Sequence, residues 1–251
     1  MTTAEASAAL SVGDMDRAFA CASEAAAAGD PHGHALLGLM LFGNDAFDDA
    51  SDHFQRAFRG LREGGELQAA AAAAIRLASI EVSRHGHEDA GRGWSERARD
   101  LLEQVGPCVE WGYWELALLS CDRTDVARLL AATERALALS RAFGDPALEA
   151  MARADRGLAL VTQGRVEEGF ADLEAAMTAV LSGEVPLAVG GGLCLCAMLT
   201  ACDRVADVRR AERWAELTRD LVHGFGERPV ALYVHCRMAW GSVLRNAGRW
   251  Q

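Results

Sequence analysis

One pattern of small and large residues limits what this chain can fold into. Small residues stand at Gly157 and Gly169, large apolar residues at Leu160 and Leu173, and a turn residue, Gly164, lies between the two halves. Two antiparallel helices joined by a tight turn approach closely only where one presents a small residue to the other, and large residues fill the groove between neighbouring pairs. The pattern therefore predicts a helical hairpin that cannot bury both of its faces alone.

The same pattern recurs along the whole chain. Its turn positions, which lie 32 to 42 residues apart, are Gly13, Asp45, Gly86, Thr124, Gly164, Ala206 and Gly248. A regular period of this length is typical of helical-repeat proteins, in which each hairpin stacks on the next. We therefore predict one helical domain over 1–251. Its repeat units are expected at about 4–28, 31–62, 68–104, 109–142, 146–181, 190–222 and, as an incomplete unit, 229–251.

The composition agrees with an all-α fold. Alanine, leucine and arginine dominate, isoleucine is rare, and lysine is absent. Because alanine, leucine and arginine favour helices, whereas β-branched residues favour strands, helix is expected almost throughout. An aspartate precedes a proline at Asp30 and at Asp145, which predicts a capped helix start at each position. Asp125 is expected to cap the helix after it.

The net charge of −11 restricts the partners of this chain. An acidic protein is repelled by nucleic acid and by anionic membranes unless it has a local basic patch. The densest arginine group, within 204–213, is interrupted by acidic residues. The uncharged segment 185–202 approaches the length of a membrane span, but its proline and three consecutive glycines favour a loop entering a buried helix. We expect neither a membrane span nor direct DNA binding.

Cysteine usage and the N-terminus predict a cytoplasmic protein. Seven cysteines are scattered without a paired framework, and the N-terminus lacks a basic region followed by a long apolar core. Cys194, Cys196 and Cys202, with His223, His235 and Cys236 downstream, form the strongest zinc candidate. The first two fall about 200° apart on a helix, so packing is favoured over metal binding.

A second ligand-like pair is His85 and His87, which flank Gly86. The pair occupies a predicted turn of the repeat, where exposed polar residues are common. No acid, base and nucleophile stand together in a recognisable catalytic motif. We therefore predict no enzymatic activity, no cofactor and no metal.

Three stretches resemble a known family. They are GDPALEAMARADRGLALVTQGRVEEGFADLEAAM (144–177), CAMLTACDRVADVRRAERW (196–214) and HCRMAWGSVLRNAGRW (235–250). The hairpin pattern resembles that of tetratricopeptide repeats, and the stretches are similar to the helical-repeat region of actinobacterial LuxR-type transcriptional regulators. The resemblance implies a right-handed α-solenoid of about 12–13 helices that binds an effector or a partner. Members of that family bind DNA through a C-terminal helix-turn-helix, so DNA binding is expected only through a domain that is not present in this chain.

In a repeat architecture of this kind, the first helix of each hairpin lines the concave face. The positions expected on that face are Arg76, Ile80, Trp111, Trp114, Leu118, Ala154, Leu158, Cys196, Thr200, His235, Met238 and Arg245. Two tryptophans beside arginines suit a peptide, or an apolar effector with an anionic group. The alternative for both tryptophans is packing between neighbouring repeats.

The sequence therefore predicts a non-catalytic scaffold that binds a protein, a peptide or a small-molecule effector in its concave groove. We expect it to be the sensor or interaction segment of a LuxR-type regulator. The alternatives are a free-standing adaptor for assembling protein complexes and, less favoured, a metal- or cysteine-dependent enzyme. Because the last motif, from Trp240 to Gly248, stops before its second helix, we expect the natural chain to continue. An uncovered end of this kind would also favour a homodimer.

Overall fold

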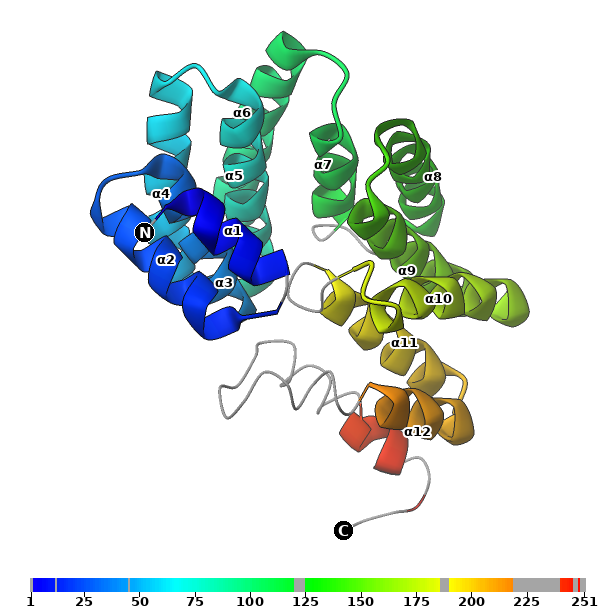
Figure 1. The fold of residues 1–251 in the computed structure, drawn as a ribbon. Helices are drawn as coiled ribbons and strands as arrows, with labels where there is room; N and C mark the ends of the chain where they lie inside the picture. The colour runs from blue at the N-terminus through cyan, green and yellow to red at the C-terminus, as the bar shows by residue number, and fades with distance from the viewer. Residues whose placement is uncertain are drawn as a thin grey trace. The chain divides into compact units, whose positions relative to one another are not determined.

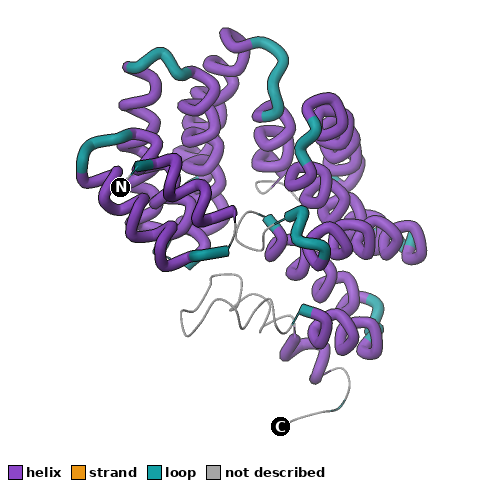
Figure 2. Tube along the Cα trace, viewed as in Figure 1, coloured by secondary structure: helices purple, strands orange, loops and turns teal. Residues whose placement is uncertain are grey.

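The computed structural model describes residues 2–11, 13–44, 46–119, 125–185, 190–218, 240–245 and 248. All regular structure within these ranges is helical, and they contain no strand (Figure 2). The predicted all-α class is therefore confirmed. No helix among these residues is both long enough and apolar enough to cross a bilayer.

The chain divides into two compact units, 1–124 and 125–251. The sequence predicted a single domain, and the boundary falls inside the predicted repeat 109–142. The two helices of that predicted hairpin have different packing neighbours. The earlier helix packs on the two helices that precede it, whereas the later one packs on the helix after it.

Consecutive helices of the first unit pack on one another (Figure 1). First helices of neighbouring hairpins also touch, α1 with α3 and α5 with α7. The elements of this unit are α1 (Thr3–Ser11), α2 (Met15–Ala27), α3 (Pro31–Gly43), α4 (Phe47–Glu63), α5 (Leu67–Ile80), the π-helical turn η1 (Glu81–His85), α6 (Glu88–Val105) and α7 (Glu110–Leu119).

The second unit follows the same rule. Consecutive helices pack on one another, and α9 also contacts α11, the first helix of the next hairpin. The elements are α8 (Val126–Phe143), α9 (Pro146–Thr162), α10 (Val166–Leu181), α11 (Gly191–Arg204) and α12 (Val208–Leu217).

The predicted helix starts are confirmed by their hydrogen bonds. The Asp30 carboxylate accepts from the backbone N–H of His32 at 2.9 Å, and that of Asp145 accepts from Leu148 at 2.9 Å. Asp125 caps α8 in the same way, through the backbone N–H of Arg128 in the first turn, at 3.0 Å. Each bond satisfies a backbone donor that has no partner within the helix.

The close approach predicted at Gly157 and Gly169 is present between α9 and α10. A Cβ atom built on either glycine would lie 2.6 Å from the carbonyl oxygen of the other. In the α3–α4 hairpin, a Cβ on Gly38 would lie 3.1 Å from the ring of Phe54. The small residues of the pattern therefore stand where two helix backbones, or a backbone and a ring, meet.

Each unit has its own buried apolar core. In the first, Leu61, Leu77 and Leu102 are almost fully buried among many alanines of α4, α5 and α6. In the second, Phe170 and Met198 are buried between α9, α10 and α11. Alanine keeps the helices close, and the large side chains supply most of the apolar area removed from water.

Candidate functional site

The two tryptophans predicted on the concave face pack within the first unit. The indole N–H of Trp111 donates to the carbonyl of Gly106 at 3.1 Å, and that of Trp114 donates to the carbonyl of Ser95, on α6, at 3.0 Å. Their rings meet edge to face, with centroids 5.5 Å apart. Both side chains are partly buried against the core of this unit. They therefore pack between helices of the first unit, as the alternative to a ligand-binding role expected.

The other predicted positions have different surroundings. Ile80 is 0% exposed and belongs to the core of the first unit, so it offers a ligand no surface. The expectation that Ile80 lies on a binding face is therefore wrong, because its side chain packs into the core around α5. Leu118 lies in α7, but its side chain is outside the described residues, as are His235 and Met238 altogether.

In the second unit, Leu158 is partly buried against the core. The hydroxyl of Thr200 donates to the carbonyl of Cys196, one turn earlier in α11, at 2.7 Å. Arg245 is exposed and donates to the hydroxyl of Ser242 at 2.9 Å. These contacts are local, and they do not by themselves identify a ligand.

Arg76 is the predicted site residue with the most unusual environment. Its guanidinium carbon lies 5.9 Å from the centre of the Tyr113 ring, so the contact joins α5 to α7. Burial lowers the pKa of Arg76, and the Tyr113 phenol opposes this effect. Within the described part of the chain, no carboxylate forms an ion pair with this guanidinium. The residue is partly buried. A partly buried cation without an anion is a candidate anion-binding group.

Arg156, on α9, has the opposite environment. It forms a bidentate pair with Asp172 of α10, at 2.6 and 2.7 Å, and donates to Glu134 of α8 at 2.7 Å. Arg153 adds a contact of 3.3 Å to the same aspartate and pairs with Glu149. The hydrogen bonds to Asp172 raise the pKa of Arg156. This network joins three helices and uses its charges internally, so its role is structural.

A third group of side chains lies at the end of α5. Glu81 and His85 belong to the π-helical turn, and Gly86 comes next with φ of 70°, a conformation that suits glycine. The backbone N–H of His87 then donates to the Glu81 carbonyl at 2.8 Å. This reversal brings the His87 side chain back beside the carboxylate of Glu81.

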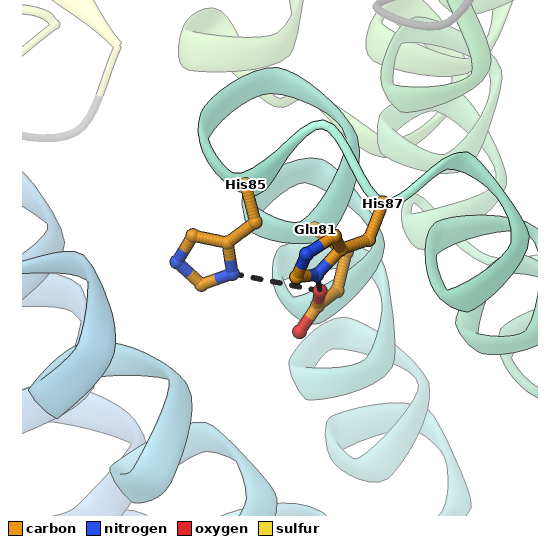
Figure 3. Close-up of side chains that lie close together, drawn as sticks. All are labelled: Glu81, His85 and His87. Atoms are coloured by element: carbon orange, nitrogen blue, oxygen red, sulfur yellow. Dashed lines mark hydrogen bonds and ion pairs between the residues drawn. The ribbon is translucent and has the colours of Figure 1, made fainter.

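Both imidazoles are directed at that carboxylate, as Figure 3 shows. The Nδ1 atoms of His87 and His85 lie 2.9 and 3.5 Å from Oε2 of Glu81. On the other side of its ring, Nε2 of His85 lies 3.2 Å from Oδ1 of Asp48, on α4. The sequence drew attention to the two histidines, but not to Glu81 or Asp48. The four-residue spacing of Glu81 and His85 was a usable signal, whereas the contact with Asp48 depends on tertiary packing.

The cysteines considered as zinc ligands are packing residues where the structure describes them. Cys194 and Cys202 are fully buried, and Cys196 is partly buried. Burial raises the pKa of Cys194 and of Cys202 to about 12. This burial disfavours the thiolate, which is the form of cysteine that acts as a nucleophile.

A histidine pair connects α3 and α4. The Nδ1 atoms of His34 and His53 are 2.8 Å apart. Burial lowers the pKa of both imidazoles, and Arg56 lowers it further. One ring must accept a hydrogen bond from the other, so at least one member of the pair is neutral in the folded protein.

No model of a known protein family matches the chain, and no protein of curated function matches it. Function must therefore be inferred from the contacts and charges of the described residues. Among these, the unpaired Arg76 and the cluster of Glu81, His85 and His87 are the groups whose surroundings favour a ligand.

Proposed function

We propose that this chain is a non-catalytic helical-repeat scaffold whose tetratricopeptide-like hairpins stack into a right-handed α-solenoid. The proposal is supported by the packing within each unit. Each hairpin packs on the next through its second helix, and first helices of successive hairpins touch at α1–α3, α5–α7 and α9–α11. Stacked repeats pack in this way because a single hairpin cannot cover both of its apolar faces.

The observation that carries the binding role is the environment of Arg76. A guanidinium has five donors in a planar fork that matches a carboxylate or a phosphate. Here it lies against the Tyr113 ring, lacks a carboxylate among the described residues, and belongs to the first helix of its hairpin. We propose that Arg76 receives the anionic group of a ligand, and that Tyr113 contacts the rest of it.

The net charge favours a small ligand over a polyanionic one. A chain of charge −11 repels an acidic macromolecule at long range, but a single anionic group that reaches a partly buried arginine gains more from the short-range contact than it loses. The preferred occupant is therefore an apolar effector with one carboxylate or phosphate, or the C-terminal carboxylate of a peptide.

We further propose, from the sequence resemblance, that the chain is the sensor segment of a cytoplasmic LuxR-type regulator. DNA would then be bound by a domain outside these residues. The alternative is an adaptor that only assembles protein complexes. The gene distinguishes the two: a basic helix-turn-helix in the same reading frame, downstream of codon 251, supports the regulator, and its absence from the full-length product supports the adaptor.

A thermal-shift screen with medium-chain carboxylic acids, aryl phosphates and short apolar peptides with free C-termini tests the binding role. Compounds that raise the melting temperature of the wild-type protein should lose this effect on Arg76→Gln. They should keep it on Arg59→Gln, which removes the same charge from an exposed position on α4. Equal shifts on all three proteins, with circular dichroism confirming that each is helical, would reject Arg76 as the anchor.

A further inference from the structure

The geometry of the cluster formed by Glu81, His85 and His87 suits a metal ion. One ligand atom from each residue lies within 4.8 Å of the others. Tetrahedral zinc with bonds of about 2.0–2.1 Å holds its ligand atoms about 3.3 Å apart. The two separations between imidazole nitrogen and carboxylate oxygen, 2.9 and 3.5 Å, lie on either side of that value. Small side-chain rotations would therefore be enough to admit an ion.

The surroundings of His85 are compatible with a cation at the same place. A carboxylate oxygen faces each of its ring nitrogens, Asp48 at Nε2 and Glu81 at Nδ1. A neutral imidazole carries one N–H, so it can donate to one carboxylate but presents a lone pair to the other. A protonated ring donates to both carboxylates. For a neutral ring, a metal ion between Nδ1 and Glu81 takes the place of the second proton and leaves the Nε2–H to face Asp48. A carboxylate behind a ligating histidine is a common partner in metal sites.

Accessibility is compatible with an exchangeable ion. The side chains of Glu81 and His85 are 14% and 23% exposed, and that of His87 is 65% exposed. The first two are held in place by packing, and the third can swing to admit the ion. The three residues come from the last turn of one helix and the residue before the next, so their backbone positions are fixed by the hairpin itself.

We propose that Glu81, His85 and His87 bind a divalent transition-metal ion of the zinc class, with Asp48 positioning His85. Two imidazoles and one carboxylate suit zinc better than magnesium or calcium, which prefer oxygen ligands alone. Three protein ligands leave at least one coordination position for water or for a ligand. The ion would tie the end of α5 to the start of α6. The inference is independent of the effector site at Arg76.

Isothermal titration of chelator-treated protein with ZnCl₂ tests the proposal. We expect one ion per chain with a micromolar or tighter dissociation constant, and a rise in melting temperature with zinc concentration because the ion binds the folded state. His87→Gln should lose the site, and this exposed substitution should leave the fold intact. Asp48→Asn should weaken binding by about tenfold, since it removes the carboxylate that orients the His85 ring.

His32→Gln is the matched control. His32 also pairs with a carboxylate of the first unit, Glu66, at 2.8 Å, but in a two-residue contact on the surface. The variant should bind zinc as the wild type does. A wild-type protein that takes up no zinc, or a His87→Gln variant that binds it unchanged, would overturn the proposal. If circular dichroism shows that His87→Gln does not fold, Glu81→Gln replaces it in the same test, because glutamine keeps the shape of the glutamate side chain.

Discussion

Two arginines, each on the first helix of a hairpin, have opposite surroundings. Arg156 of the second unit donates to carboxylates of α8 and α10, and its pKa is raised. Arg76 of the first unit lies against a phenol ring, and burial lowers its pKa. The first cation is neutralised by the fold, whereas the second has no anion among the described residues.

The difference separates charges that hold the fold from charges that are available to a ligand. Breaking a desolvated ion pair destabilises the protein, because the remaining partner is left buried and unpaired. A desolvated ion that is unpaired already contributes little to stability, and its removal is neutral or favourable. Stability measurements can therefore assign a role to each group before any ligand is known.

The largest effect is expected at the centre of the second unit's network. Asp172→Ala should destabilise the protein by about 2–3 kcal/mol, because it leaves two partly buried arginines without their shared carboxylate. The control is Glu168→Ala, which removes only the exposed partner of Arg165 and should change little. Thermal unfolding followed by circular dichroism gives both values. Equal stabilities for the two variants would mean that the network does not hold the second unit together.

A backbone contact tests the same unit without charge. Gly157→Ala should lose about 2 kcal/mol, because its Cβ would collide with a carbonyl oxygen that side-chain motion cannot relieve. Gly93→Ala, in α6, should instead gain about 0.5–1 kcal/mol, since a Cβ there meets nothing within 4 Å and alanine favours helix. The opposite signs are the prediction, and a shared sign would show that the close helix approach is wrong.

The histidine pair of α3 and α4 makes the stability of the first unit depend on pH. The pKa values of His34 and His53 are lowered in the folded protein, mainly by burial. The unfolded chain therefore binds more protons below pH 6.5, and stability should fall as pH decreases through that value. Nearby Asp49 and Asp52 oppose the shift of His53 but do not reverse it.

Melting temperatures measured from about pH 8 to about pH 5 test this expectation. The wild-type protein should lose stability over the acidic part of the range, and His53→Gln should lose less. His32→Gln should behave as the wild type does. A His53→Gln profile parallel to that of the wild type would show that the pair does not couple folding to protonation.

Much of the helical framework could be predicted from the sequence, because its signals are local. The caps at Asp30 and Asp145 and the contact between Gly157 and Gly169 depend on residues close in the chain or on a fixed offset in the repeat. The division near Thr124 was not predicted, since it depends on which neighbours each helix packs against.

The candidate sites were harder to predict for the same reason. Ile80 was assigned to a surface by its offset, yet tertiary packing buries it completely. The meeting of Glu81 with His87 requires a π-helical turn and a reversal at the next glycine, and the sequence pattern specifies neither. In the described structure, Arg76 has no carboxylate partner. Which residues surround it depends on other helices, and the residue spacing within α5 does not show them.

The most direct measurement compares the thermal unfolding of Arg76→Met and Arg156→Met. Both substitutions remove the guanidinium and leave an apolar side chain of similar length. Arg76→Met should melt at or slightly above the wild-type temperature, whereas Arg156→Met should lose about 2 kcal/mol. If Arg76→Met were destabilised as much as Arg156→Met, Arg76 would be part of the structural framework, and its assignment to a ligand would be contradicted.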